Sequence, residues 1–326
     1  MRTIMMSKNI TDSTMNSMMK RYRKLFCLLW ALILIGSIGG NIGGNIGIAQ
    51  GKESKNKKLL IGTAPYYYKD KLRQGFKPLM QYLSDELGRE AELVVTKSYK
   101  ELGDKLEDGS IDIGFVSSVF YVQLKQRDPK LTYLVTAQTT QEGKKTSYYF
   151  SWLIARKDSG ITKVKHFRGK SFAFTDKLSS AGYIYPQGYF RWRHLVPEEF
   201  FAKVVFAGTH EKVTDMIAKG EVETGASYDG NIWSAEERYG RIFRRIKRMG
   251  PILNPSFVAA GHVDKALCGH LITALENMPS KVQNENLLYI GFRALSKSNF
   301  TIVEDFLKTV DAPNGPKAGT ATDKKK

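Results

Sequence analysis

KLEDGSIDIG at residues 105–114 and MIAKGEVETG at residues 216–225 follow one pattern, and this pattern decides the fold. In both segments a short amphipathic run stops at a glycine, and a short hydrophobic run follows at once. A glycine in the left-handed conformation commonly ends a helix. The hydrophobic run after it is typical of a buried strand. Two copies of this helix–glycine–strand pattern predict two similar α/β units in one chain.

Outward from the first segment, the chain alternates between strands and helices. Phe76 begins a series of apolar residues at helical spacing that runs to Leu87, and Gly88 is suited to end this helix. The expected strands are 59–62, 91–96 and 111–116, and the expected helices are 76–87 and 99–108. Strands that alternate with helices indicate a parallel sheet with helical crossovers.

The second segment extends in the same way. The expected strands are 148–156, 170–174, 203–206 and 222–227, and the expected helices are 180–192 and 210–219. We therefore predict an α/β protein of two lobes, each a mainly parallel sheet flanked by helices, with a ligand cleft between them. Lobe I is expected at 59–152 plus 250–310, and lobe II at 153–249.

The N-terminus has the order of an export signal. A positive cluster at 20–24 precedes an uncharged apolar run at 25–38, and a small-residue stretch ends at Ala49. We predict a signal peptide at 1–49 that is cleaved near Ala49, and therefore a protein exported to the periplasm. The alternative is an uncleaved membrane anchor. Residues 50–58 read as a linker, and 311–326 as a disordered tail.

The chain is strongly basic, with 50 Lys+Arg against 32 Asp+Glu and a net charge of +18. Removal of 1–49 leaves 44 basic and 31 acidic residues, a net charge of +13. This charge favours anionic partners. Because basic residues are scattered among acidic ones in an exported chain, we predict no nucleic-acid partner. The histidines lack metal-ligand spacing and no catalytic motif is present, so the sequence favours neither a metal site nor an enzyme.

Polar side chains gather at the turns that follow the predicted strands, where ligands bind in open α/β sheets. Ser179 and Ser180 follow one strand and open a helix, and Ser117 and Ser118 do the same in the first unit. A helix N-terminus suits an oxyanion, although a serine there is also an ordinary N-cap. His210 similarly offers a ligand contact or a cap.

Asp229 lies in the turn Ser-Tyr-Asp-Gly after another predicted strand. A carboxylate there would accept a hydrogen bond from a protonated ligand oxygen or from an amino group. The competing interpretation is an Asx turn with Gly230.

Segments 75–88, 109–122, 168–186 and 208–230 resemble the substrate-binding proteins of phosphate/phosphonate/phosphite-type ABC importers, the phosphonate-binding family. The resemblance implies a type II periplasmic-binding-protein fold. Ser179 and Ser180 match the family's Ser-Thr-Ser-Gly motif, whereas Ala181 lacks its third hydroxyl. His210 and Asp229 match a histidine and an acidic turn of the family. Tyr66, Tyr67 and Ser118 are candidates to replace the missing hydroxyl.

The resemblance implies an exported solute-binding protein that closes on a small oxyanion, such as a phosphonate, phosphite or phosphate-like ion. No cofactor is expected. The expected partners are an ABC permease and its ATPase subunits, and the protein itself is expected to be a monomer. One alternative keeps the fold but makes it the sensing module of a signalling system. A further alternative is an enzyme that acts on a phosphorylated compound.

Overall fold

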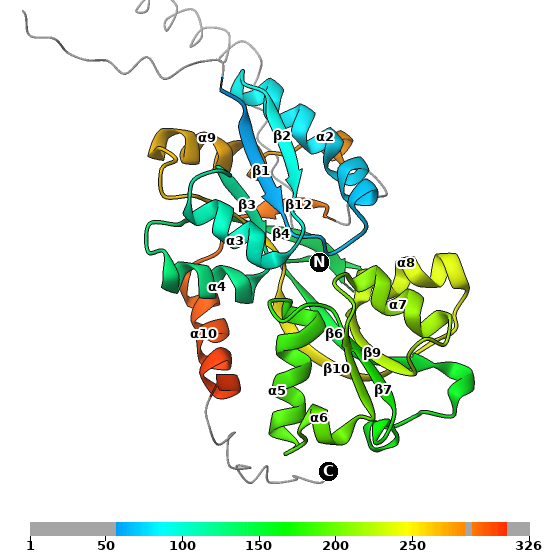
Figure 1. Ribbon diagram of the computed structural model, residues 1–326. Helices are drawn as coiled ribbons and strands as arrows, with labels where there is room; N and C mark the ends of the chain where they lie inside the picture. Colours follow the sequence, from blue (N-terminus) through cyan, green and yellow to red (C-terminus); the bar gives the residue numbers. More distant parts are fainter. Residues whose placement is uncertain (1–56, 142, 284–288, 312–326) are drawn as a thin grey trace, which may run out of the picture. The chain divides into compact units, whose positions relative to one another are not determined.

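The computed structural model describes residues 57–141, 143–283 and 289–311 (Figure 1). The predicted signal peptide at 1–49, most of the linker and the tail beyond 311 lie outside the described residues. The described residues belong to one compact unit, Ser54–Lys326. Within them, no helix is both long enough and apolar enough to cross a bilayer.

The first sheet of the described residues has three parallel strands at one end, formed by the predicted first unit. β1 (Leu59–Thr63) pairs in parallel with β2 (Ala91–Val95) and with β3 (Ile113–Val116). Four strands extend the sheet in antiparallel fashion: β4 (Thr132–Gln141), β5 (Lys144–Thr146), β11 (Ser256–Ala259) and β12 (Gly291–Arg293). Apart from β5, which pairs with β4, the strand order is β12-β4-β11-β3-β1-β2.

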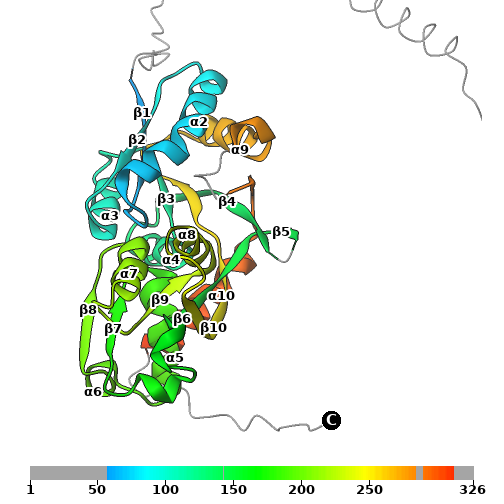
Figure 2. The same cartoon turned by 90° about the vertical axis from the view of Figure 1, so that its right-hand side faces the viewer.

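Helices cover both faces of this sheet (Figures 1 and 2). α2 (Lys69–Leu87) and α9 (Lys265–Glu276) share one hydrophobic cluster with β1, β3, β4 and β11. A second cluster joins α3 (Tyr99–Glu107), α4 (Ser118–Arg127) and α10 (Lys297–Asp311). The predicted apolar series is buried from Phe76 to Leu83, and its last member, Leu87, is partly buried. However, α2 begins at Lys69, because Leu72, one turn before Phe76, is also buried.

The second sheet repeats this plan. β7 (Ser171–Phe174) pairs in parallel with β8 (Lys203–Phe206) and β9 (Thr224–Tyr228). β6 (Tyr148–Arg156) lies antiparallel to β9 and to β10 (Phe243–Leu253), which gives the order β10-β6-β9-β7-β8. The flanking elements are the π-type turn η3 (Ser180–Ile184), α5 (Tyr185–Trp192), α6 (Pro197–Phe200), α7 (His210–Ala218) and α8 (Asp229–Tyr239). Short 3-10 turns complete the described chain at η1 (Lys157–Ser159), η2 (Val164–Phe167) and η4 (Ser280–Val282).

The repeated pattern at 105–114 and 216–225 has the same structure in both copies. α3 leads into β3 and α7 leads into β9, and the two intervening glycines, Gly109 and Gly220, have φ angles of 77° and 75°. These left-handed angles favour glycine over any residue with a Cβ atom. The helix–glycine–strand prediction is therefore confirmed, and the parallel pairs lie where the strand–helix units were expected.

Two long strands carry the chain between the two sheets. β6 and β10 pair from Phe243 with Arg156 to Leu253 with Tyr148. The predicted lobe boundaries at 152/153 and 249/250 thus fall inside these paired strands. Just beyond them, the buried Asn254 donates through its side-chain amide to the carbonyl of Ala137, which ties the crossing to β4. The division into lobes remains a prediction.

Candidate ligand-binding site

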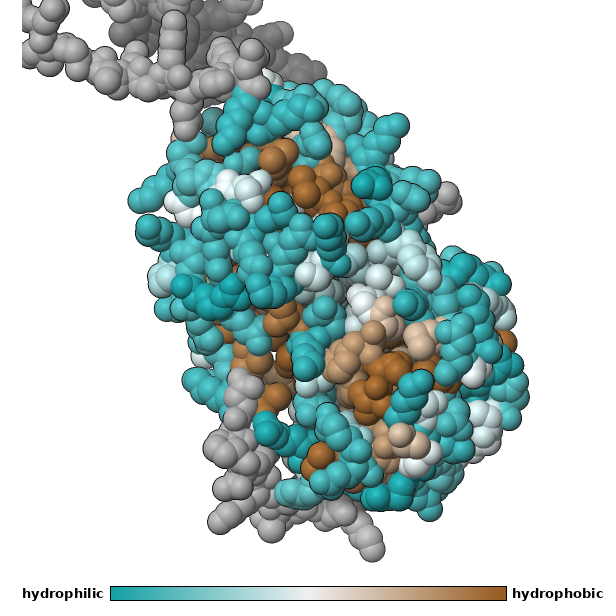
Figure 3. Space-filling view, in the orientation of Figure 1, coloured by the Kyte–Doolittle hydropathy of each residue, from teal (hydrophilic) through white to brown (hydrophobic). Residues whose placement is uncertain are grey.

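A cavity of about 250 Å³ lies where the two sheets face each other, and residues from both sheets and their helices line it. Its polar lining includes Ser117, Ser179, Ser180, His210 and Asn254. Its aromatic lining comprises Tyr66, Tyr99, Phe115, Phe120, Tyr149, Tyr228, Trp233 and Tyr289. Hydrophilic side chains cover most of the face seen in Figure 3, with separate hydrophobic patches between them.

Three helical segments begin at or beside this cavity, and a hydroxyl side chain caps each. Ser117 accepts from the N–H of Phe120 at the start of α4, and Ser179 accepts from the N–H of Gly182 in η3. Thr209 caps α7 by accepting from the N–H of Lys212. The N-cap and the ligand interpretations of these turns are therefore compatible, since the capped ends carry the positive pole of the helix.

Ser180 joins the first and second of these helix starts. Its hydroxyl accepts from the N–H of Val119 at 3.4 Å, so a side chain of η3 reaches the first turn of α4. In η3 the N–H of Tyr185 bonds to the carbonyl of Ser180, five residues apart, which makes the turn wider than an α-helix. Such π turns are frequent at functional sites. Ser117, Ser179 and Ser180 all line the cavity, whereas Ser118, predicted with them, does not.

The ring of His210 contacts three hydroxyl groups. Its Nε2 lies 3.1 Å from the hydroxyl of Ser179, and its Nδ1 lies 3.2 Å from that of Ser227 and 3.3 Å from that of Thr175. Burial lowers the pKa of His210 to about 3, so the ring is neutral. Its nitrogens are occupied by hydroxyls, and its ring packs edge-on against Tyr228. His210 thus positions Ser179. Thr175 and Ser227, which complete the contacts, gave no sequence signal beyond their position at strand ends.

Gly182 allows η3 to lie close to these side chains. A Cβ atom at this position would be 2.2 Å from Oγ1 of Thr175 and 3.0 Å from Cε1 of His210. The glycine of the Ser-Ser-Ala-Gly segment is therefore required by close packing.

Five of the predicted site residues line the cavity: Tyr66, Ser117, Ser179, Ser180 and His210. The structure places the other four behind the lining. The carbonyl of Ala181 accepts from the hydroxyl of Ser151, and Tyr67 packs against Tyr66 with ring centroids 5.3 Å apart. Ser118 is buried, and its hydroxyl has no hydrogen-bond partner among the described residues.

Asp229 is the fourth of these residues. Its carboxylate accepts from the N–H of Phe150 at 2.9 Å and from Nε1 of Trp152 at 2.5 Å. Burial raises its pKa despite these hydrogen bonds. In this structure the carboxylate joins α8 to β6, and neither an Asx turn with Gly230 nor a contact with the cavity is among its hydrogen bonds.

The tyrosines that line the cavity are donors. Burial raises the pKa of Tyr66, Tyr99, Tyr149, Tyr228 and Tyr289, so their hydroxyls stay protonated at neutral pH. Trp233 lies at the edge of the cavity with 48% of its surface exposed. Among the described residues, no group of His, Cys, Asp and Glu is arranged to hold a metal ion.

Beside the cavity, the start of α2 is tied to α7. The backbone N–H of Tyr68 donates to Oε2 of Glu211 at 2.6 Å, and the hydroxyl of Tyr68 donates to Asp215 at 2.8 Å. The N–H of His210 donates to the carbonyl of Tyr66. Since Tyr68 makes no side-chain cap of its own, a carboxylate from the facing element caps α2.

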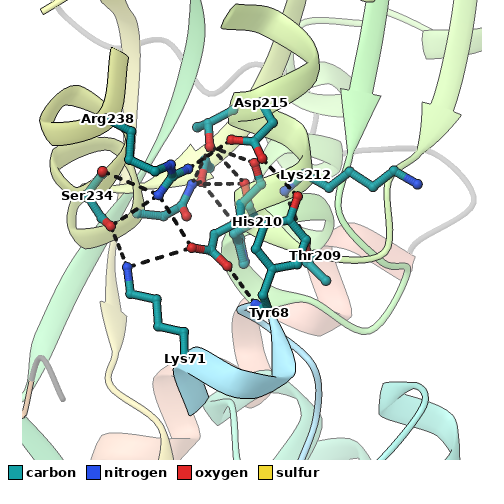
Figure 4. Close-up of polar contacts among 12 residues, drawn as sticks. Tyr68, Lys71, Thr209, His210, Lys212, Asp215, Ser234 and Arg238 are labelled. Carbon is teal, nitrogen blue, oxygen red and sulfur yellow. Dashed lines mark hydrogen bonds and ion pairs between the residues drawn. The ribbon is translucent and has the colours of Figure 1, made fainter. Parts of the chain in front are cut away.

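Lys71 of α2 adds a charged contact (Figure 4). Its Nζ donates to the hydroxyl of Ser234 at 2.6 Å and lies 3.7 Å from Oε1 of Glu211. Arg238 of α8 pairs with Glu211 and with Asp215, at 3.4 and 2.9 Å. The Glu211 side chain is only 3% exposed. We call the contacts of Tyr68 and Lys71 with Glu211, Asp215 and Ser234 the inter-sheet latch.

Comparison with known proteins agrees with this architecture. A family described as "ABC transporter, phosphonate, periplasmic substrate-binding protein" matches residues 61–300. The phosphate-import protein PhnD of Mycolicibacterium smegmatis is 23% identical over 217 residues, which cover 59% of this chain and 67% of that protein. The tetrathionate sensor histidine kinase TtrS of Salmonella typhimurium is 26% identical over 113 residues, 34% of this chain but only 19% of the kinase.

Among solved structures, the binding protein component of an ABC phosphonate transporter from Pseudomonas aeruginosa has the same fold. Its TM-score is 0.72 at 17% identity, over 81% of this chain and 91% of that one. The matched family consists of transporter binding proteins rather than enzymes, which agrees with the binding role predicted from the sequence. The chain therefore belongs to the family of periplasmic substrate-binding proteins of phosphonate ABC transporters.

Proposed function

We propose that this protein captures a small oxyanion, such as a phosphonate, phosphite or phosphate-like ion, in the cavity between its two sheets. One observation carries the proposal: capped helix starts that belong to both sheets converge on this cavity, with Ser117 from α4 and Ser179 and Ser180 from η3. Free N–H groups and the positive pole of a helix suit an anion there.

Capture requires that the two lobes approach each other. The lobes as predicted, 59–152 plus 250–310 and 153–249, are joined by β6 and β10, which can act as the hinge. A ligand that contacts both α4 and η3 stabilises the closed form by its higher affinity for that form. The latch, which bonds α2 to α7 and α8 beside the cavity, supports closure around the same point.

The proposed transport function requires partner proteins in the membrane. The loaded protein delivers its ligand to an ABC permease driven by ATPase subunits, acts as a monomer, and reaches the periplasm by means of the signal peptide at 1–49. These assignments rest on the sequence and on the family.

A thermal-shift panel tests the proposal. Phosphonates, phosphite, phosphate, sulfate and sulfonates are each added to the mature protein. A ligand at a hundred times its dissociation constant adds about 2.7 kcal/mol to the free energy of unfolding. We expect the melting temperature to rise by roughly 5–10 °C for at least one oxyanion. A panel without any shift, repeated by calorimetric titration, contradicts the proposal.

A sensing role on the same fold is the second candidate, and the similarity to a segment of a sensor histidine kinase favours it. Both roles predict ligand binding, so the discriminating measurement uses the partner. Stimulation of ATP hydrolysis by a reconstituted permease–ATPase complex supports import, whereas stimulation of a kinase supports sensing.

A further inference from the structure

The cavity has an electrostatic property that restricts its ligand. None of the described residues that line it is Lys, Arg, Asp or Glu. The sequence of the internal stretches outside the described residues, 142 and 284–288, contains no lysine or arginine either. His210, the titratable ring of the lining, is neutral because burial holds its pKa at about 3. An anion in this cavity therefore meets hydroxyls, N–H groups and helix ends, but no described cation.

Several charged side chains outside the lining are paired with one another. Glu211 faces Lys71 and Arg238, and Arg238 also pairs with Asp215. Arg245 pairs with Glu236, at 3.0 Å. Asp229 uses both carboxylate oxygens on Phe150 and Trp152. These pairs contribute no net positive charge of their own to the surroundings of the cavity.

The cavity is also larger than an inorganic oxyanion needs. Its volume is about 250 Å³, whereas one water occupies roughly 30 Å³ in the liquid. Beyond the hydroxyls of Ser117, Ser179 and Ser180, eight aromatic side chains form the largest group of the lining, with Tyr149, Tyr228 and Trp233 among them. The lining also has the polar side chains Thr139, Thr140, Gln141 and Asn254. An apolar group that leaves water for such walls gains free energy in proportion to the area it buries.

We propose that the cavity selects a singly charged oxyanion that carries an aromatic or extended alkyl substituent, in preference to an inorganic or doubly charged one. This inference rests on the proposed function and specifies its ligand. The hydroxyls and helix ends hold the charged head, and the aromatic walls hold the substituent. The cost of burying an ion rises with the square of its charge, and no cation among the described lining residues offsets that cost for a dianion. Organic phosphonates and organic sulfonates both supply this chemistry.

The size of the substituent is tested by calorimetric titration with phenylphosphonate, propylphosphonate, methylphosphonate and inorganic phosphate. We expect phenylphosphonate to bind at least about tenfold more tightly than methylphosphonate, and phosphate to bind most weakly. A preference for phosphate or methylphosphonate overturns this inference but leaves the proposed function intact. If no oxyanion binds, both are overturned. The isosteric pair propylphosphonate and 2-aminoethylphosphonate tests the apolar character, and tighter binding of the amine also contradicts it.

The charge of the head group is tested by varying the pH and by comparing a phosphonate with a sulfonate. An organic phosphonate loses its second proton near neutral pH, whereas a sulfonate keeps a single charge. From pH 5 to pH 8 we expect the affinity for phenylphosphonate to fall by roughly tenfold and that for benzenesulfonate to stay constant. His210 and the tyrosines of the lining do not titrate in this range. An increase in phenylphosphonate affinity with pH overturns the inference. Comparing phenylphosphonate with benzenesulfonate at pH 5 tells whether the phosphonate or the sulfonate head group binds more tightly.

A pair of tryptophan variants locates the substituent. Trp233 lines the cavity and Trp192 does not, although their exposed fractions are 48% and 50%. We expect Trp233→Ala to weaken phenylphosphonate binding several-fold while methylphosphonate binding stays within about twofold. Trp192→Ala is expected to change neither. The proposed arrangement is contradicted if Trp233→Ala loses the same affinity for both ligands. It is also contradicted if this variant loses no affinity for phenylphosphonate.

Discussion

At the scale of single residues, the site depends on hydroxyls whose positions are set by a buried neutral ring. Ser179 caps η3 and also contacts His210, which in turn is held by Ser227 and Thr175. The sequence could predict Ser179 and Ser180, because hydroxyls before a helix follow a simple rule. It could not predict that His210 contacts the hydroxyls of Ser179, Ser227 and Thr175, because those contacts depend on separate segments meeting in space.

Ser180→Ala removes a hydroxyl from the cavity, and we expect the affinity for a bound oxyanion to fall about tenfold to a hundredfold. Calorimetric titration with the tightest ligand of the panel measures it. Ser84→Ala is a matched control, because Ser84 also accepts from a backbone N–H, that of Ala91, but lies away from the cavity. Equal affinities in the two variants remove Ser180 from the binding site.

Gly182→Ala places a methyl group 2.2 Å from Oγ1 of Thr175. We expect a loss of about 1–3 kcal/mol in the free energy of unfolding, measured by urea denaturation, together with weaker ligand binding. In Gly269→Ala, the control in α9, the new Cβ atom has nothing within 4 Å. That change is expected to be neutral or slightly stabilising. A neutral Gly182→Ala variant contradicts the close packing of η3.

His210 makes stability depend on pH. Its folded pKa of about 3 is below the usual 6.5, so the unfolded state binds the additional proton between these values. Stability therefore falls as the pH drops from 6.5 toward 3, by at most about 1.4 kcal/mol per pH unit. We expect His210→Asn to flatten this part of a urea-denaturation profile. His194→Asn, at an exposed position with φ of 54°, should not alter it. Parallel profiles for His210→Asn and the wild type refute the assignment.

At the scale of elements, the latch couples α2 to α7 and α8 close to the residues that line the cavity. Tyr66 and His210 line it, while their neighbours Tyr68 and Glu211 form the latch. Contacts that exist only when the two sheets are close stabilise that form relative to a more open one. Ligand affinity should therefore depend on latch residues that do not touch the ligand.

Lys71→Met tests this coupling, since it removes the ammonium that contacts Ser234 and Glu211. We expect a larger radius of gyration for the ligand-free protein in small-angle X-ray scattering and an affinity lower by roughly three- to thirtyfold. Lys100→Met removes an exposed pair with Asp104 inside α3 and should change neither quantity. Identical scattering and affinity for Lys71→Met and the wild type exclude a role in closure.

The helices and strands were largely predictable, because the spacing of apolar residues and the glycines at helix ends are local signals in the sequence. β6 and β8 have the predicted bounds, and Gly88, Gly109 and Gly220 have left-handed φ angles at helix ends. The antiparallel additions to both sheets, such as β11 beside β3, were not predictable. β11 pairs with β3 across about 140 positions and β6 pairs with β9 across about 77, and the pattern of one strand does not specify so distant a partner.

At the scale of the whole molecule, the basic charge acts on the rate at which an anion arrives. The chain carries +18, and +13 after removal of 1–49. Because the described lining of the cavity is uncharged, this surplus affects the approach of the ligand more than its final contacts. The sequence alone predicted the surplus but not where it lies.

We expect the association rate constant for an oxyanion to fall at least about twofold when ionic strength rises from 0.01 to 1 M, because the Debye length shrinks from about 30 to about 3 Å. The dissociation rate constant should change much less. Stopped-flow titration measures both constants, with a neutral osmolyte as the control for viscosity. A salt effect confined to dissociation contradicts steering by the surface charge.

The position of Trp233 gives the protein an intrinsic optical reporter. Its indole is half exposed and borders the cavity, whereas Trp192 is similarly exposed away from the cavity and Trp152 is bonded to Asp229. Indole emission moves to shorter wavelength when water leaves the ring. Occupation of the cavity is therefore readable as a blue shift of the native fluorescence, without a dye or label, and the Trp192→Ala protein yields this signal against a lower background.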